Sequence, residues 1–166
     1  QSKFKAENRL LELNDDQFTV SILRIPMIYG PQAPGNIQSV IKLVNYLPII
    51  PLGNINNRRS FISIRNLVYS IDRVLNCRKE GVFLLADDET ISTSSLVSII
   101  IKGIDKNRFL LDSGLIRLLI RLLVPSVYEK LWGNLVINCR VSKELLSLDF
   151  PVDVKAGLAD MLQLKQ

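Results

Sequence analysis

Apolar residues recur along the chain with two different spacings, one typical of helices and one typical of strands. Apolar positions three or four residues apart predict helices over residues 1–13, 37–47, 65–77, 96–103, 114–124, 127–132, 141–148 and 153–164. Short runs of apolar and β-branched residues predict strands over residues 18–25, 60–64, 81–86 and 108–111, the first of them mostly buried. Because helices and strands alternate, the sequence predicts an α/β fold in one compact unit.

The segment 114–124 (GLIRLLIRLLV) is apolar on nearly every side and carries two arginines four residues apart. Such a helix can lie on a membrane surface, dock a partner helix, or be buried with its arginine side chains reaching solvent. Burial is the commonest of the three and is the one we expect. The segment is too short to span a bilayer.

Composition narrows the chemistry. The chain has 166 residues, 48% of them hydrophobic, and no histidine, which excludes imidazole-dependent catalysis and histidine-ligated zinc. Acid–base chemistry must then use Tyr, Lys, Asp, Glu or a group from outside the chain. Cys77 and Cys139 form no CxxC motif, so free thiols are favoured over a single disulfide. The polar opening, residues 1–12, contains no signal peptide, and we expect a soluble, cytoplasmic protein.

The net charge of +5 favours an anionic partner: a nucleic acid, a membrane surface or a phosphorylated small molecule. The charges are scattered and no nucleic-acid motif is present, so we expect neither nucleic acid nor membrane as a partner. None of the 8 glycines falls into GxGxxG or GxxxxGK[ST]. A dinucleotide, if one is used, must therefore have its pyrophosphate bound outside this chain.

Adjacent arginines, Arg58 and Arg59, come just before a predicted strand, and guanidinium groups match phosphate oxygens well. Because successive residues of a strand point to opposite faces, we expect the two side chains to diverge, with one of them facing a cleft. A solvent-exposed surface pair is the alternative. Asn36 precedes a predicted helix, where it either caps the helix or helps to bind an anion.

Two other charged groups have simpler interpretations. Lys3 lies on a predicted helix among other charged residues, and on its own it is expected to be solvated. The acidic segment 87–89 has no calcium-loop spacing around it, so we expect a solvated turn.

Taken in order, several motifs resemble a known family. These motifs are Ser2-Lys3 with Lys5-Ala6-Glu7, Leu23-Arg24 through Tyr29-Gly30-Pro31, Asn36, Pro51-Leu52-Gly53 through Asn57-Arg58-Arg59-Ser60-Phe61, Asn66-Leu67-Val68, and the tail 145–158 with Ser147 in place of a glycine. Over residues 1–163 the chain resembles the C-terminal half of an extended short-chain dehydrogenase/reductase of the NAD-dependent sugar-nucleotide epimerase/dehydratase kind. It is most similar to bacterial UDP-hexose and UDP-N-acetylhexosamine 4-epimerases of surface-polysaccharide synthesis.

The resemblance implies a fold and a division of the chain. The fold is the last part of a Rossmann-type sheet followed by a small mixed α/β domain. Residues 1–31 would be the remnant of the Rossmann domain, and residues 32–166 the substrate-binding domain. The family's catalytic tyrosine would lie four residues before Lys3, two residues ahead of Gln1, so the isolated chain is expected to be inactive. The intact enzyme is expected to be a homodimer.

The resemblance also implies residue roles. Lys3 would be the lysine of the family's YxxxK active-site motif. There its ammonium favours the phenolate form of the tyrosine and donates a hydrogen bond to the nicotinamide ribose. The expected residues beside NAD are Lys3, Ile25, Pro26 and Ile28, and those for the UDP-sugar are Asn36, Leu52, Gly53 and Arg59. In the family the tyrosinate takes a proton from the sugar 4-hydroxyl while C4 gives hydride to NAD. The resulting 4-keto sugar turns over in the site and receives the hydride on its other face.

Alternative functions stay open at this stage. A nucleotide-sugar dehydratase or reductase of the same family would use the same residues. A non-catalytic UDP-sugar-binding module would keep the substrate residues alone. No metal is expected in any of these.

Overall fold

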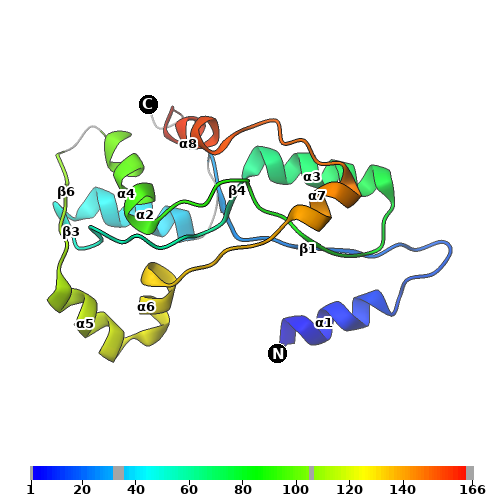
Figure 1. Cartoon of the computed structure of the whole chain (residues 1–166), viewed down its shortest axis with the longest axis horizontal. Helices are drawn as coiled ribbons and strands as arrows, with labels where there is room; N and C mark the ends of the chain where they lie inside the picture. Colours follow the sequence, from blue (N-terminus) through cyan, green and yellow to red (C-terminus); the bar gives the residue numbers. More distant parts are fainter. Residues whose placement is uncertain (1, 32–35, 105–106, 164–166) are drawn as a thin grey trace.

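The computed structural model describes residues 2–31, 36–104 and 107–163, and in them helices and strands alternate as the sequence predicts (Figure 1). The strands are β1 (Ser21–Arg24), β2 (Met27–Tyr29), β3 (Ile49–Ile50), β4 (Phe61–Ser63), β5 (Gly81–Leu84) and β6 (Phe109–Leu110). The helices are α1 (Ser2–Leu11), α2 (Asn36–Tyr46), α3 (Ile64–Cys77), α4 (Thr93–Lys102), α5 (Gly114–Leu123), α6 (Pro125–Trp132), α7 (Arg140–Leu146) and α8 (Val154–Gln163).

All the strand pairs in the described residues are parallel, and each joins segments far apart in the sequence. β1 pairs with β5, β2 with β4, and β3 with β6. Parallel neighbours need a crossover connection: α2 lies in the connection between β2 and β4, and α3 lies in the connection between β1 and β5. The predicted α/β class is confirmed.

Two hydrophobic clusters hold these elements together. The larger one gathers buried side chains from β2, α2, α4 and α8, among them Tyr29, Ile37, Val97 and Leu158. The smaller one lies between α3, β5 and α7 and contains Phe83 and Leu146 among others. Ile28 contacts both clusters, so β2 is the element at which they meet.

Serine hydroxyls begin three of the helices. Ser63 Oγ accepts from the Asn66 amide at the start of α3, and Ser92 Oγ accepts from the Ser95 amide at the start of α4. Ser113 does the same for α5. These bonds satisfy amide groups that have no partner within the helix.

The prediction that the first strand is mostly buried was wrong for the described part of the chain. The residues of β1 are half-buried, and Arg24 is exposed. The reason is topological: among the described residues β5 is the strand that pairs with β1, so the other edge of β1 has no strand beside it. α1 is also uncovered, with no buried residue.

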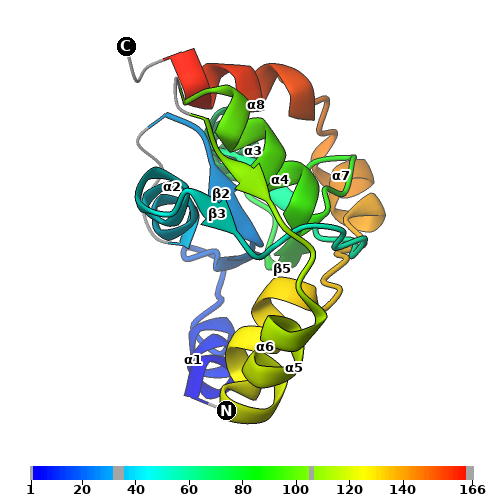
Figure 2. The ribbon, with the colours of Figure 1, turned by 90° about the vertical axis from the view of Figure 1, so that its left-hand side faces the viewer.

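The prediction that segment 114–124 is buried was wrong as well. α5 has no buried residue, and it packs mainly against α6. Figures 1 and 2 show α5 and α6 together at the side of the molecule opposite α8. Within this pair Tyr128 stacks on Trp132 with ring centroids 5.3 Å apart, and the Arg121 guanidinium lies 5.7 Å from the Tyr128 ring centre. An apolar composition alone cannot distinguish a buried helix from one at an edge of the molecule.

Cys77 and Cys139 are free and half-buried, as expected. In residues 2–31, 36–104 and 107–163, no helix combines the length and the apolar character that crossing a bilayer requires. The proposed division at residue 31 does not separate the sheets, because β1 on one side of it pairs with β5 on the other.

Candidate functional site

Two strand pairs meet end to end, and this junction positions the candidate site. β1 and β2 are separated by only Ile25 and Pro26, so the carboxyl ends of β1 and β5 adjoin the amino ends of β2 and β4. Hydrogen bonds continue across the junction, from the Leu85 amide to the Arg24 carbonyl (3.1 Å) and from the Asp87 amide to the Phe61 carbonyl (2.8 Å). Ligands of α/β proteins bind outside the carboxyl ends of parallel strands.

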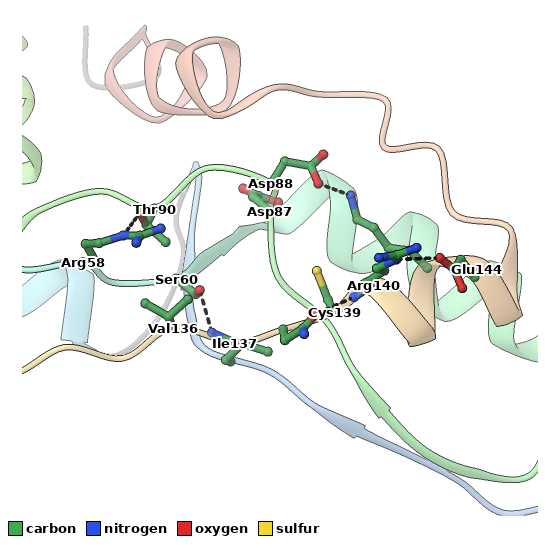
Figure 3. A pocket seen from close by; sticks show the side chains of 12 residues that line it. Arg58, Ser60, Asp87, Asp88, Thr90, Val136, Ile137, Cys139, Arg140 and Glu144 are labelled. Carbon is green, nitrogen blue, oxygen red and sulfur yellow. Dashed lines mark hydrogen bonds and ion pairs between the residues drawn. The ribbon is translucent and has the colours of Figure 1, made fainter.

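A cavity of about 360 Å³ opens beside this junction (Figure 3). Its walls come from three segments and from α7: Arg58, Ser60, Asp87, Asp88, Thr90, Val136, Ile137, Asn138, Cys139, Arg140, Lys143 and Glu144. Most of its charges are paired with one another. Lys143 binds Asp88, and Arg140 binds Glu144 at 2.9 Å. No metal-binding group of three or more acidic or cysteine side chains occurs in the described residues.

Asp87 is buried at the edge of this cavity, which corrects the expectation of a solvated turn. Its carboxylate accepts from the Tyr29 hydroxyl (2.7 Å), the Ser63 amide (3.1 Å) and the Asn66 side-chain amide (2.8 Å). Burial raises the pKa of Asp87, and the hydrogen bonds act in the opposite direction. Asp88 and Glu89 are exposed as expected. Asp87 differs because the chain continues from β5 into the core at this point.

Arg58 and Arg59 diverge, as predicted. Arg58 lines the cavity, and its Nε lies 3.4 Å from Thr90 Oγ1. Arg59 is half-buried and directs Nη1 to the Gly133 carbonyl at 2.8 Å, at the carboxyl end of α6. Its partial burial lowers the pKa of the guanidinium, which nevertheless stays charged. The Arg58 side chain therefore lines the cavity, and the Arg59 side chain points toward the end of α6 instead.

Arg59 and Pro26 lie at the same end of the β2–β4 pair. Met27 is in register with Phe61, so Pro26 precedes β2 where Ser60 precedes β4, with Arg59 one residue earlier. The backbone of Arg59 is fixed on both sides by bridges to Ile91 and Leu135. The guanidinium thus projects from a rigid support close to the junction.

Asn57 holds this support in place, a role that its place in the motif 57–61 did not indicate. Its side-chain amide donates to the Thr93 hydroxyl (3.1 Å) and to the carbonyls of Leu131 and Gly133 (3.0 Å each), and its oxygen accepts from the Thr93 amide (2.8 Å). One buried asparagine therefore joins the start of α4 to the end of α6. Its place in the family motif, just before the two arginines, was the available signal, and it does not indicate burial.

Lys3 lies exposed on α1. Glu7, one helical turn further along α1, accepts from Arg24 Nε at 3.1 Å, which attaches α1 to the carboxyl end of β1. This attachment brings the helix of Lys3 to the strand that leads into Ile25 and Pro26. The pKa of Glu7 is lowered by its hydrogen bonds from Arg24.

The other predicted residues differ in how accessible they are. Ile25 is 37% exposed and Pro26 is half-buried, whereas Ile28 packs between the two core clusters. Leu52 is buried, and its carbonyl accepts from Ser94 Oγ at 2.6 Å.

Gly53 lies directly against the segment that follows β6. Its amide donates to the Leu111 carbonyl at 3.0 Å. Asn36 begins α2, but its side chain lies outside the described residues.

Comparison with known proteins places this geometry in a family context. In an alignment 169 residues long, gaps included, the chain is 31% identical to a UDP-glucose 4-epimerase from Vibrio cholerae. The alignment covers 98% of this chain and 52% of the relative. The chain thus spans about half the length of the curated relative it matches. No protein-family model matches it.

Solved structures share the fold at low sequence identity. A dTDP-glucose 4,6-dehydratase from Bacillus anthracis, in complex with NAD, aligns with a TM-score of 0.68 at 18% identity, over 98% of this chain and 49% of its own. A UDP-glucose 4-epimerase from Thermotoga maritima, with UDP-glucose, aligns with a TM-score of 0.67 at 15% identity, over 97% and 50%. The resemblance drawn from the motifs is confirmed: the chain is similar in sequence to about half of a UDP-glucose 4-epimerase, and it shares the fold of about half of a solved sugar-nucleotide dehydratase and of a solved epimerase.

Proposed function

We propose that this chain is the substrate-binding half of an NAD-dependent nucleotide-sugar 4-epimerase, of the UDP-glucose or UDP-N-acetylglucosamine type, acting in bacterial surface-polysaccharide synthesis. Residues 1–31 are its share of the Rossmann domain, and residues 32–166 form the substrate domain. The observation that carries the proposal is Arg59, whose backbone is fixed at the same end of the β2–β4 pair as Pro26 and whose side chain is half-buried. The 31% identity to a UDP-glucose 4-epimerase supports the reaction type.

Arg59 binds the diphosphate of the nucleotide sugar. A guanidinium has five N–H donors, and the recorded bonds of Arg59 to described residues use only Nη1. The remaining donors suit a bidentate contact with phosphate oxygens. Because Asn57 and the bridges to Ile91 and Leu135 already fix this segment, little conformational freedom is lost on binding.

Asn36, Leu52 and Gly53 complete the nucleotide site. The start of α2 presents backbone amides that favour the anionic diphosphate. The Leu52–Gly53 backbone, held by Ser94 and Leu111, forms a flat edge for the uracil. Firm binding of this remote part leaves the sugar free to turn, as a 4-epimerase requires.

The junction fits the nicotinamide end of NAD. Ile25 is apolar and yet 37% exposed beside Pro26, which offers an apolar wall to a planar ring. The ammonium of Lys3 is accessible on the helix attached to that strand and would hold the ribose. Ile28 supports the wall from the core. NAD held there would supply the acceptor and later donor of the hydride at C4 of the sugar.

Lys3 also acts on the tyrosine that precedes this chain in the proposed enzyme. An ammonium close to a phenol stabilises the phenolate and so lowers the phenol pKa from about 10 toward neutrality. The phenolate then takes the proton of the sugar 4-hydroxyl. Without that tyrosine, residues 1–166 bind but do not catalyse. The proposed enzyme is a cytoplasmic homodimer that pairs through the helix to which α1 belongs.

A nucleotide-sugar 4,6-dehydratase is the second candidate, because one such enzyme aligns over 98% of this chain. NMR analysis of the products formed by the natural full-length protein separates the two reactions. An epimerase interconverts two sugars without net loss of water, and a dehydratase releases water and leaves a keto sugar. A binding module without chemistry gives no product at all.

The two adjacent arginines provide a matched test of the site. We expect Arg59→Ala to weaken UDP binding by about 10- to 100-fold in calorimetric titration, because charge-assisted hydrogen bonds are lost. Arg58→Ala, which removes the cavity arginine, is expected to change UDP affinity by less than about threefold. Unchanged affinity in Arg59→Ala, with a normal circular dichroism spectrum, would refute the proposed site.

A further inference from the structure

The outer face of α5 is a row of exposed leucines. These side chains and their exposed fractions are Leu115 (69%), Leu118 (52%), Leu119 (46%), Leu122 (68%) and Leu123 (75%). Spacings of three and four residues place them along one side of the helix. Ile116 and Ile120 are half-buried instead, next to the leucine row. Leaving five leucines of one short helix in water is costly, so this leucine face calls for an apolar partner.

The polar edge of α5 is purely cationic. Arg117 and Arg121 lie one turn apart on the side away from the leucine face, and α5 contains no carboxylate. The ion pairs found in the described residues involve neither arginine. Arg121 lies over the Tyr128 ring, which leaves its donors available.

The position of α5 makes this face accessible. The helix lies with α6 at the side of the molecule opposite α8 (Figure 2). The segment that leads into it, from β6 onward, adds exposed apolar side chains: Phe109 is 69% exposed and Leu111 is 48% exposed. Ile49 on β3, which is in register with Phe109 on β6, is 54% exposed. Exposed apolar side chains therefore also occur in the segment that leads into the helix.

We propose that α5 is an interfacial helix that lies in the plane of an anionic lipid bilayer, with its leucine face among the acyl chains and Arg117 and Arg121 at the lipid phosphates. A large apolar face opposite basic residues is typical of such helices. With ten residues α5 is about 15 Å long, which suits lying on a bilayer and not crossing it. The inference goes beyond the proposed epimerase and does not depend on it.

The composition of the face favours lipid over a protein partner. Protein interfaces are enriched in aromatic residues, and leucine is under-represented among their energetic hot spots. Here the exposed row is entirely leucine, and the aromatic side chains of Tyr128 and Trp132 stack on each other in α6. The expectation of a buried helix, which counted against membrane contact, does not hold for α5.

Vesicle flotation tests the proposal on the natural full-length protein. We expect binding to phosphatidylcholine vesicles that contain phosphatidylglycerol, and weaker binding to phosphatidylcholine alone. The double variant Leu118→Glu with Leu122→Glu should reduce partitioning at least about tenfold, because two apolar anchors are lost. Arg117→Gln with Arg121→Gln should weaken binding to the anionic vesicles only.

Leu75→Glu is the matched control, since Leu75 is 69% exposed on α3, away from α5. It should bind vesicles as the unmodified protein does. Absence of vesicle binding by the unmodified protein, or equal partitioning of all variants, overturns the proposal. Light scattering tests whether a second copy of the chain covers the leucine face instead. If the unmodified protein is a dimer that does not bind vesicles, and the double leucine variant is a monomer, the face belongs to a second copy and the lipid proposal is overturned.

Discussion

The hydroxyl of Tyr29 donates to Oδ2 of Asp87 over 2.7 Å, and both residues are buried. This bond joins β2 to the segment that follows β5, so it connects the two strand pairs at the junction. Asn66 extends the connection, because its side-chain amide donates to Asp87 and to the Val152 carbonyl at 2.8 Å each. The Asp87 carboxylate thus connects β2, α3 and, through Asn66, the segment before α8. Burial and this carboxylate together raise the pKa of Tyr29 far above its ordinary value, so the phenol stays protonated.

Removing the Tyr29 hydroxyl tests this connection. Tyr29→Phe should lower the free energy of unfolding by about 1–3 kcal/mol, because a buried carboxylate loses one of its donors. Urea denaturation followed by circular dichroism measures the change. Tyr46→Phe is the control, since Tyr46 is 81% exposed, and it should leave stability unaltered. Equal stabilities for both variants would show that the bond contributes nothing.

Gly53 is required by the close approach of another segment. A Cβ there would lie 2.8 Å from both the Asp112 amide nitrogen and the Leu111 carbonyl carbon, which are backbone atoms that cannot rotate away. Gly53→Ala should therefore destabilise the fold by about 1–3 kcal/mol and weaken UDP binding. At Gly114 nothing lies within 4 Å, so Gly114→Ala should be neutral or slightly stabilising. Thermal unfolding and UDP titration of both variants distinguish these outcomes.

Ser147 ends α7 in the left-handed conformation, with φ of 49°. A side chain is disfavoured in this region, and glycine is the usual residue at such a helix end. Ser147→Gly should raise the free energy of unfolding by about 0.5–1 kcal/mol. The same change at Ser39, within α2, should destabilise by about 0.5 kcal/mol because glycine is a poor helix former. A loss of stability in Ser147→Gly would contradict this account.

The attachment of α1 to β1 should depend on pH through Glu7. Arg24 lowers the pKa of Glu7 below its ordinary value of 4.5, so the folded state favours the carboxylate. The stabilisation is present above pH 4.5 and is lost as the pH falls through the lower pKa of the folded state. NMR shifts of α1 amides should therefore change with acidification.

Two glutamine variants isolate the group responsible. Glu7→Gln should remove this pH dependence, because it leaves Arg24 without an ionisable partner on α1. Glu12→Gln, just after α1, should retain it. A pH response that survives in Glu7→Gln would assign the effect to another group.

The sequence determined the type and order of the helices and of four strands, because helix and strand formation depend on local spacing and caps. It did not predict β2 and β3, since strands of three and two residues depend on pairing with distant segments. The alternation of helices and strands and the divergence of Arg58 and Arg59 both follow from neighbouring residues. The family motifs depend on short segments as well, so the resemblance could also be drawn from the sequence.

Only the tertiary structure decided which residues are buried and which face the cavity. Asp87 belongs to an acidic segment but accepts three hydrogen bonds in the core, because Tyr29, Ser63 and Asn66 reach it from distant parts of the chain. α5 has the composition of a buried helix and is exposed. Burial depends on contacts between segments far apart in the sequence, and a local pattern carries no information about which of them come together.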